Sequence, residues 1–309
     1  MTTGKNQRRF SAAFFVRIAI DTLSAKVVAI YAGRDHIHGK PQETRMKIDL
    51  SGTTALVTGS TGGIGHAIAK GLATTGADVV VNGRSQARVD QAIASIGKVA
   101  PSAKVRGVVA DVSAAEGCAA LVKAVPQVDI LINNAGIFEP KPFFDILDED
   151  WHRFFDVNVM SGIRLSRAYM PGMLKRNWGR IVFIASESAI VIPKEMIHYG
   201  MTKTAQLSVS RGLAEMTKGT AVTVNSVMPG PTMSEGVETF VADLAKQNGQ
   251  SVETAAANFI KEHRPSSLIQ RFATVDEVAN MVVYVASREA SVTNGAALRA
   301  EGGLVQTIV

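Results

Sequence analysis

Residues 54–65 read TALVTGSTGGIG, a short apolar run followed at once by a glycine-rich turn. Glycines let the backbone bend tightly there and approach a phosphate, and an amphipathic stretch at 63–75 follows. A strand, a glycine-rich turn and a helix in this order are typical of a dinucleotide-binding fingerprint. The turn therefore predicts a nucleotide cofactor at the first strand of an α/β sheet.

Apolar runs and helix-like stretches alternate along the rest of the chain. The further runs lie at 78–82, 104–110, 128–133, 179–185, 221–227 and 296–300. They are apolar on both faces, as strands of a buried parallel sheet are, and amphipathic stretches separate them, for example 86–98, 151–176, 199–217 and 274–286. This alternation predicts an α/β fold: a Rossmann-type doubly wound parallel sheet of about seven strands with helices on both faces. One domain from about residue 46 to 309 is the simplest interpretation.

Residues 232–268 interrupt the alternation. They are helix-prone, and they follow Pro229-Gly230-Pro231 and precede Pro265. Helical segments in this position commonly close over an active site, so we expect a helical substrate flap. The alternative is an ordinary helical hairpin packed on the surface.

Composition excludes several classes of protein. The 309 residues are 46% hydrophobic and 19% charged, which is ordinary for a soluble globular protein. Residues 1–45 hold eight basic and three acidic residues, so most of the net charge of +6 lies there and the remainder is nearly neutral. The main body thus indicates no nucleic-acid partner. No stretch reaches the ~20 apolar residues of a membrane span.

The first 45 residues do not match a secretory signal. Their apolar core is interrupted by Arg17, Asp21 and Lys26, and a transit peptide is only weakly indicated. Since Met46 opens MKIDLSGTTALVTGS, a natural domain start, we interpret residues 1–45 as a dispensable or poorly ordered extension. Cys118 is the only cysteine, so no internal disulfide can form, and a reducing, cytoplasmic compartment is expected.

Tyr199 and Lys203 indicate acid/base chemistry. They lie four residues apart in a helix-like stretch, which places both side chains on one helix face. An ammonium within about 4–6 Å of a phenol favours the phenolate and lowers the phenol pKa. The pair is thus expected to exchange a proton near neutral pH, although this spacing alone is common on helix surfaces.

Six motifs together resemble the short-chain dehydrogenase/reductase family, in particular its 3-oxoacyl-carrier-protein reductase-like members. They are Thr-Gly-x-x-x-Gly-x-Gly at 58–65, Asn-Asn-Ala-Gly at 133–136, Asn158, Ser186, Tyr-x-x-x-Lys at 199–203, and Pro229-Gly230. They occur in the family's order and extend from about Lys47 to Gly302-Gly303. Glu301 departs from the Asp-Gly-Gly ending of many relatives, which should not affect chemistry.

The resemblance implies a role for each catalytic residue. Tyr199 exchanges a proton with the substrate oxygen, and Ser186 hydrogen-bonds that oxygen. Lys203 lowers the pKa of Tyr199 and holds the nicotinamide ribose, and Asn158 anchors a water that links Lys203 to solvent. No metal is implied, since the six histidines are scattered.

The resemblance also implies cofactor contacts along the carboxyl edge of the sheet. The expected cofactor-binding residues are Gly59, Ser60, Thr61, Gly63, Ile64, Gly65, Arg84, Asp111, Val112, Asn133, Ala135, Gly136, Tyr199, Lys203, Pro229, Gly230 and Thr232.

The end of the second strand favours NADP(H). An acid there would hydrogen-bond the ribose 2′-hydroxyl and repel a 2′-phosphate, but Gly83 holds that position. Arg84 follows, and a guanidinium suits a phosphate as a bidentate donor. Asn82 and Ser85 are candidates for further hydrogen bonds to the phosphate. NAD(H) remains the alternative, with Arg84 on the adenine or in solvent.

We therefore predict an NADP(H)-dependent oxidoreductase (EC 1.1.1.-) that interconverts a carbonyl and a secondary alcohol on a small molecule. The alternatives are an NAD(H)-dependent dehydrogenase, another reaction on the same fold, and a cofactor-binding regulatory protein without turnover. Glu187 and His198 neighbour the catalytic residues, and both orientations, toward the substrate and away from it, stay open. The resemblance implies a homo-oligomer, a tetramer or dimer formed through the helices at about 151–176 and 199–217.

Overall fold

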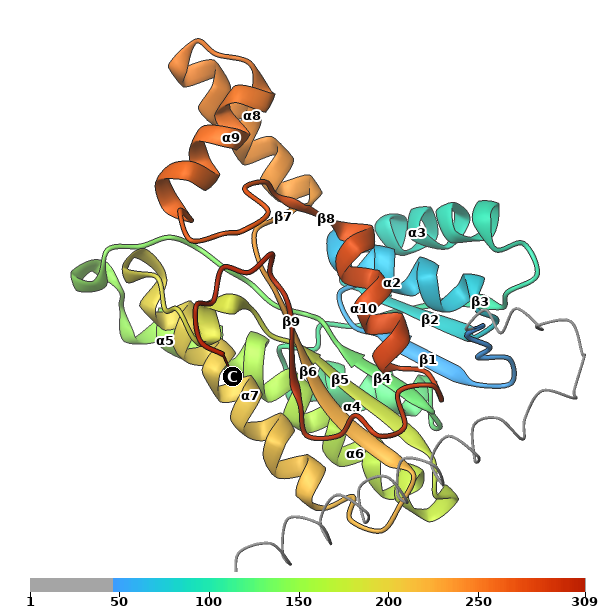
Figure 1. Ribbon diagram of the computed structural model, residues 1–309. Coiled ribbons are helices and arrows are strands. Elements are labelled where there is room, and N and C mark those ends of the chain that lie inside the picture. Colours follow the sequence, from blue (N-terminus) through green and yellow to red (C-terminus); the bar gives the residue numbers. More distant parts are fainter. Residues whose placement is uncertain (1–46, 309) are drawn as a thin grey trace, which may run out of the picture. The chain divides into compact units, whose positions relative to one another are not determined.

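The computed structural model describes residues 47–308, and the predicted extension, residues 1–45, lies outside them. A seven-stranded sheet runs through the described part, in the order β3-β2-β1-β4-β5-β6-β9 (Figure 1). Its strands are β1 (Thr54–Val57), β2 (Asp78–Gly83), β3 (Val105–Val109), β4 (Ile130–Asn133), β5 (Gly179–Ile184), β6 (Val222–Pro229) and β9 (Ala297–Ala300). Every neighbouring pair is parallel, which confirms the predicted doubly wound sheet.

The strand order reverses between β1 and β4. The chain runs outward from β1 through β2 to β3, then returns to pair β4 with β1 on the other side. In open α/β sheets, ligands bind at the carboxyl ends of the strands beside such a reversal. The glycine-rich turn after β1 and the Asn133–Gly136 segment after β4 both lie at that position.

Alternate residues of the strands build two separate cores. Ala55, Val57, Val79 and Val81 pack on one face with residues of α2 (Gly63–Thr74), α3 (Gln86–Val99) and α10 (Val275–Val285). Leu56, Val80 and Leu131 pack on the other face with residues of α4 (Ala115–Ala124) and α6 (Ser161–Arg176). This period of two, with both faces covered, explains why the strands read as continuous apolar runs.

The outer strands are less buried than expected. Of β3, Arg106 and Val109 are exposed, and of β9, Ala297 is exposed. The prediction that all seven runs are buried on both faces is wrong for these two, because an edge strand has a neighbour on one side only.

The helix expected at 151–176 is made of three segments. α5 (Asp148–Phe155) passes into a π-helical turn at Asp156–Met160, and α6 follows without a break. α7 (Ile197–Glu215) matches the expected stretch at 199–217 closely. A π-helical turn inside an α-helix frequently marks a functional site, and here it carries Asn158.

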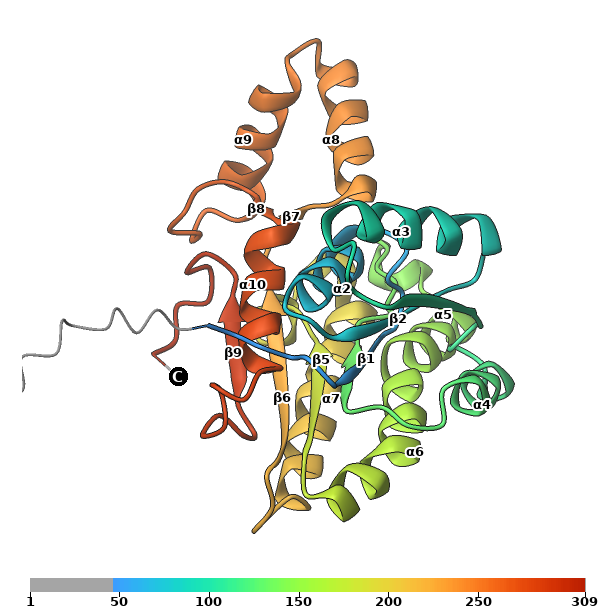
Figure 2. The ribbon, with the colours of Figure 1, turned by 90° about the vertical axis from the view of Figure 1, so that its right-hand side faces the viewer.

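The segment expected as a flap forms two helices, α8 (Glu235–Asn248) and α9 (Val252–His263). They pack against each other around a small core of their own that includes Val241, Ala255 and Ile260. Figure 2 shows this helical hairpin extending beyond the carboxyl ends of the strands, away from the body of the sheet. Its closure over a substrate stays a prediction.

Among residues 47–308, no helix combines the length and the apolar character needed to cross a membrane.

Candidate active site

Tyr199 and Lys203 share one face of α7, as their spacing predicts. Lys203 Nζ lies 5.5 Å from the centre of the Tyr199 ring. Lys203 is buried, and its ammonium donates to the carbonyl oxygen of Ile184 at 2.9 Å, at the end of β5. The helix thus presents both side chains at the carboxyl edge of the sheet.

The electrostatics of this pair differ from the expectation. Burial lowers the pKa of Lys203 to about 7, and the nearby Glu187 carboxylate opposes that shift. Burial raises the pKa of Tyr199 and the charge of Glu187 raises it further, while hydrogen bonding with Ser186 lowers it. The pKa of Tyr199 is thus raised overall in the protein without ligand, and the expected lowering by Lys203 stays a prediction. A lysine that is half neutral near pH 7 stabilises a phenolate weakly, and desolvation disfavours both charged forms.

The low pKa of Lys203 makes the stability of the cofactor-free protein depend on pH. A lysine in the unfolded chain keeps a pKa of about 10.4, so between about pH 7 and 10 the unfolded chain binds more protons than the folded one. The free energy of unfolding is expected to rise with pH across this window relative to a Lys203→Met variant. Urea unfolding of both proteins at pH 7 and 9.5 measures it, and parallel pH dependences would contradict the low pKa.

Ser186 follows β5 and begins a short 3-10 turn at Glu187–Ala189. The Ser186 hydroxyl donates to Glu187 Oε2 at 2.5 Å and accepts from the Ser188 amide at 3.1 Å. Ser186 and Glu187 are both buried. Glu187 therefore belongs to the site, which answers one of the two questions left open by the sequence.

The second open question concerned His198, which points away from the other residues of the candidate site. It is fully buried, with its ring 4.0 Å from that of Phe154 and 6.0 Å from that of Trp151 on α5. Burial lowers its pKa, and neither ring nitrogen has a hydrogen-bond partner in the described part of the chain. His198 thus packs α7 on α5.

Asn158 ties the π-helical turn to its surroundings. Its side chain accepts from the Ile137 amide at 2.8 Å and donates to the Ile137 carbonyl and to Thr202 Oγ1, both at 3.0 Å. A Cβ placed on Gly136 would lie 3.3 Å from Asn158 Oδ1 and 3.6 Å from Lys203 Nζ, so these residues meet at one point. The expected water at Asn158 stays a prediction.

The glycine-rich turn after β1 is locked to the segment after β4. Asn134 Nδ2 donates to the carbonyls of Thr58 and Gly59, at 2.9 and 3.1 Å. Thr58 Oγ1 accepts from the amides of Asn134 and Ala135, both at 3.0 Å. Asn134 was not among the expected cofactor residues, although it belongs to the Asn-Asn-Ala-Gly motif, and it shapes the turn. The side chain of Asn133 is instead buried and donates to Ser166 Oγ at 3.1 Å.

The N-terminus of α2 offers a phosphate site. Among the described residues, no side chain caps this helix, and its first turn has no acid. Gly59 and Gly63 have positive φ, of 60° and 55°, and Ile64 and Thr61 are half-buried beside them. Unpaired amides and the positive helix dipole suit a pyrophosphate, so the residues present fit the expected dinucleotide. Ser60 is fully buried and holds the turn instead, donating to the Val57 carbonyl at 2.7 Å.

Gly65 leaves no room for a side chain. An added Cβ would lie 2.4 Å from Asn134 Nδ2 and 2.5 Å from the Gly59 carbonyl oxygen. A Gly65→Ala variant is expected to lose at least tenfold in dinucleotide affinity and about 1–3 kcal/mol of stability, because the turn must shift. Calorimetric titration and thermal unfolding measure both.

Gly97→Ala on α3 is the matched control, since nothing lies within 4 Å of a Cβ there. It is expected to keep dinucleotide affinity and to gain up to about 1 kcal/mol of stability. Unchanged affinity in Gly65→Ala would show that this turn does not hold the ligand.

The end of β2 is built without an acid. A Cβ on Gly83 would lie 2.4 Å from Thr61 Cγ2, so Thr61 would have to move for any larger residue. Arg84 is exposed next to it. Ser113 hydrogen bonds lower the pKa of Asp111, and the charge of Arg84 lowers it further, which places Arg84 and Asp111 near each other. Asp111 is exposed and Val112 buried at the end of β3.

Asn82 cannot add a phosphate contact. It is 1% exposed, and its amide donates to the carbonyls of Val108 and Ala110 at 3.2 and 3.1 Å. Its Oδ1 accepts from the Gly59 amide at 3.3 Å, so the side chain is used inside the protein.

The turn after β6 closes the site on its far side. Thr232 is buried and donates to the Gly230 carbonyl at 2.9 Å, and Pro229 is the last residue of β6. A Cβ on Gly230 would lie 2.8 Å from the Cα of Glu301, so the C-terminal segment packs directly on this turn. The carboxylate of Glu301 accepts from the amides of Leu304 and Val305, so it holds that segment.

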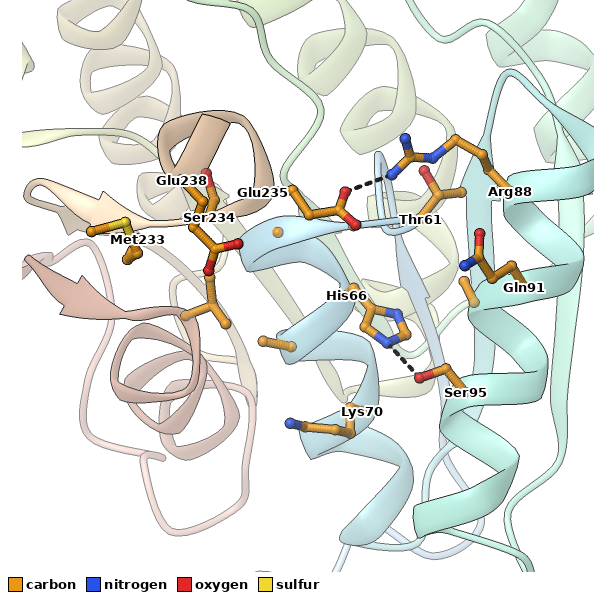
Figure 3. A pocket seen from close by; sticks show the side chains of 15 residues that line it. Thr61, His66, Lys70, Arg88, Gln91, Ser95, Met233, Ser234, Glu235 and Glu238 are labelled. Carbon is orange, nitrogen blue, oxygen red and sulfur yellow. Dashed lines mark hydrogen bonds and ion pairs between the residues drawn. The ribbon is translucent and has the colours of Figure 1, made fainter. Parts of the chain in front are cut away.

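α8 also contacts the cofactor half of the protein. Figure 3 shows Glu235 at the start of α8 reaching Arg88 of α3, with Arg88 Nη2 and Glu235 Oε2 2.7 Å apart. A cavity of about 310 Å³ lies beside this pair and is lined by Thr61, His66 and Glu238 among others. Both charged side chains are more than half exposed, so the pair adds little stability.

No cluster of three or more metal-ligating side chains occurs within residues 47–308.

Comparisons with known proteins agree with this geometry. A family model described as short chain dehydrogenase matches residues 53–245. The chain is 51% identical to the uncharacterized oxidoreductase YvaG of Bacillus subtilis (strain 168), over 85% of this chain and 100% of that protein. It is 32% identical to gluconate 5-dehydrogenase of Gluconobacter oxydans (strain 621H), over 84% of this chain and 97% of that protein.

A solved structure with the same fold is that of L-sorbose reductase from Gluconobacter frateurii, complexed with NADPH and L-sorbose. Its TM-score is 0.80 at 32% identity, with 85% of this chain and all of the other covered. The activities on gluconate and L-sorbose are those of the relatives. The expected 3-oxoacyl-carrier-protein reductase branch is supported only loosely, by one similar structure described as a putative betaketoacyl-ACP reductase.

Proposed function

The chain belongs to the short-chain dehydrogenase/reductase family of NAD(P)-dependent oxidoreductases, and on this basis we propose an NADP(H)-dependent enzyme that interconverts a carbonyl and a secondary alcohol. The observation that carries the proposal is the meeting of Ser186, Tyr199 and Lys203. The first follows β5 and the others lie on α7, yet all three gather beside the carboxyl edge of the sheet.

We assign the proton transfer to Tyr199. In the reductive direction its hydroxyl donates to the oxygen of the substrate, and in the oxidative direction its phenolate accepts the alcohol proton. The Ser186 hydroxyl donates to the same oxygen and stabilises its developing charge. When bound, the nicotinamide supplies or accepts the hydride. Lys203 and Asn158, both buried beside Tyr199, are assigned to the exchange of its proton with solvent through a water held by Asn158.

NADP(H) is proposed over NAD(H) because of Gly83 and Arg84. Gly83 brings no acid that would repel a 2′-phosphate, and Arg84 is an exposed cation next to it. The glycine-rich turn and the amides of α2 hold the pyrophosphate.

A small molecule is proposed as substrate. Phe138, Ile190, Val191 and Ile192 are exposed apolar side chains, and the Phe138 ring centre lies 6.3 Å from that of Tyr199. An enzyme that recognises an acidic carrier protein needs basic side chains that are not already paired with acids. Lys141 and Arg153 are paired with Asp150, and Arg164 is paired with Asp156, so these three basic side chains are already engaged.

Homo-oligomer formation through α6 and α7 stays part of the proposal. Phe154, Leu165 and Met170 belong to the core, so these residues do not supply the interface.

The experiment is a turnover assay on the full chain. NADPH oxidation is followed with L-sorbose and other small ketones, and NADP⁺ reduction with gluconate and simple secondary alcohols. Turnover with at least one substrate, with lower kcat/KM for NADH or NAD⁺, supports the proposal. Tight dinucleotide binding without turnover on a wide panel would favour the regulatory alternative.

A further inference from the structure

Ser186 has one hydroxyl proton and, in this structure, Glu187 holds it. The 2.5 Å distance from Ser186 Oγ to Glu187 Oε2 is typical of a hydroxyl donating to a carboxylate. The Ser188 amide donates to Ser186 Oγ at 3.1 Å, so the serine oxygen is fixed from both sides.

This arrangement conflicts with the role of Ser186 in the proposed reaction, on which the present inference rests. A carbonyl oxygen is an acceptor only, so Ser186 must donate its single proton to that oxygen. Glu187 and the substrate therefore compete for the same proton. Some group has to stabilise the carboxylate once Ser186 turns to the substrate, because Glu187 is buried, with 7% of its side chain exposed.

Arg264 is placed to stabilise it. It follows the last residue of α9, and its Nε lies 3.6 Å from Glu187 Oε1, the oxygen that does not contact Ser186. Its Nη1 lies 3.8 Å from Glu195 Oε1 and donates to the His263 carbonyl at 2.7 Å. Both carboxylate distances are too long for a hydrogen bond, so the guanidinium has not yet engaged either acid closely.

Arg264 also has room to move. It lines a cavity of about 370 Å³ together with Pro193, Glu195 and Leu304. Its side chain is only 15% exposed, so a closer contact with Glu187 would form in a mostly water-excluded site, where charge pairs are strong.

We propose that Glu187 and Arg264 are positioning residues for Ser186. Glu187 holds the Ser186 proton in the free enzyme, and Arg264 draws the carboxylate away when a substrate oxygen takes that proton. Because Arg264 follows the last residue of α9, the exchange is linked to the position of the helical hairpin formed by α8 and α9.

The charges that face Glu187 set the sign of each expected effect. They are Arg264 and Glu195 on one side and Tyr199 and Lys203 on the other, and Glu187 raises the pKa of both Tyr199 and Lys203. Neutralising Glu187 therefore lowers both pKa values, and removing Arg264 raises both, since the carboxylate charge is then uncompensated.

The test compares Glu187→Gln, Arg264→Gln and the double variant, with Glu195→Gln as the matched control for the second acid near Arg264. Arg264→Gln is expected to lose about tenfold or more in kcat/KM, mainly through a higher KM for the substrate. The pKa read from the pH profile of kcat/KM is expected to move upward by about one unit. Glu187→Gln moves it downward. The double variant is expected to recover activity relative to Arg264→Gln, because no buried charge is left uncompensated. Glu195→Gln is expected to have a smaller effect than either single variant, because Glu195 contacts Arg264 but not the Ser186 hydroxyl.

A second readout needs no turnover. The pKa of Lys203 is followed by NMR of protein labelled with ¹³C at lysine Cε, with the resonance assigned by its loss in Lys203→Arg. Opposite shifts in Glu187→Gln and Arg264→Gln support the pair even if every substrate of the panel fails, which would count against the proposed function alone. The Glu187, Arg264 and Glu195 variants are expected to bind NADPH like the wild type.

Additive losses in the double variant, shifts of the same sign in the two single variants, or an equal effect of Glu195→Gln would overturn the proposal. If Arg264→Gln unfolds, Arg264→Lys keeps the charge and is expected to show the same upward shift, reduced in size.

Discussion

A Tyr199→Phe variant is expected to bind NADPH as the wild type does and to lose roughly 10²–10⁴-fold in kcat, the usual contribution of a positioned general acid or base. The change removes only the hydroxyl that exchanges the proton. Tyr199 is half-buried on α7, and its ring, which packs edge-on near Phe138, is retained. The fold and the dinucleotide site should therefore remain.

Steady-state kinetics with the best substrate and calorimetric titration with NADPH measure the two effects separately. Tyr284→Phe on α10 is the matched control, a half-buried tyrosine outside the candidate site, and it should keep full turnover. Retained turnover in Tyr199→Phe would remove the proposed general acid, and the alternatives on the same fold would have to be reconsidered.

An Arg84→Asp variant is expected to weaken NADPH binding by at least about 100-fold and to leave NADH binding equal or improved. The substitution replaces a bidentate phosphate donor by a charge that repels the 2′-phosphate and accepts from a ribose 2′-hydroxyl. Arg84 is exposed at the end of β2, so its charge can be reversed without burying an acid.

Dissociation constants for both dinucleotides, measured at fixed ionic strength, give the preference directly. Lys98→Glu reverses a charge in the last turn of α3, the helix that follows Arg84, and should change neither constant by more than about twofold. A wild-type preference for NADH, or equal losses for both dinucleotides in Arg84→Asp, would show that Arg84 does not recognise a phosphate.

The elements of this protein are largely encoded locally. Every predicted apolar run from 54 to 300 forms a strand within two residues of its expected ends, because the period of two and the β-branched content are properties of each segment. The π-helical turn at Asp156–Met160 was missed, since one extra residue in a helix leaves the apolar pattern almost unchanged.

The sequence predicted which residues lie in the candidate site better than it predicted what each side chain contacts. Ser186, Tyr199 and Lys203 lie together as expected. Asn133 and Asn134, neighbours in one motif, have different tasks, with the first turned toward Ser166 and the second holding the glycine-rich turn. No sequence pattern distinguishes two adjacent asparagines, because the face each one presents depends on the path of the strand before them.

The sequence by itself determined the sheet, the glycine-rich turn and the residue types of the candidate site, because these depend on short-range periodicity and on residues a fixed number of positions apart. Only the tertiary structure decided the protonation and the partners of those residues. The pKa values of Tyr199 and Lys203 follow from burial under several elements at once. The approach of Arg264 to Glu187 joins the end of α9 to the end of β5. Desolvation and contacts of this kind depend on neighbours that are distant in the chain, so no local sequence pattern reports them.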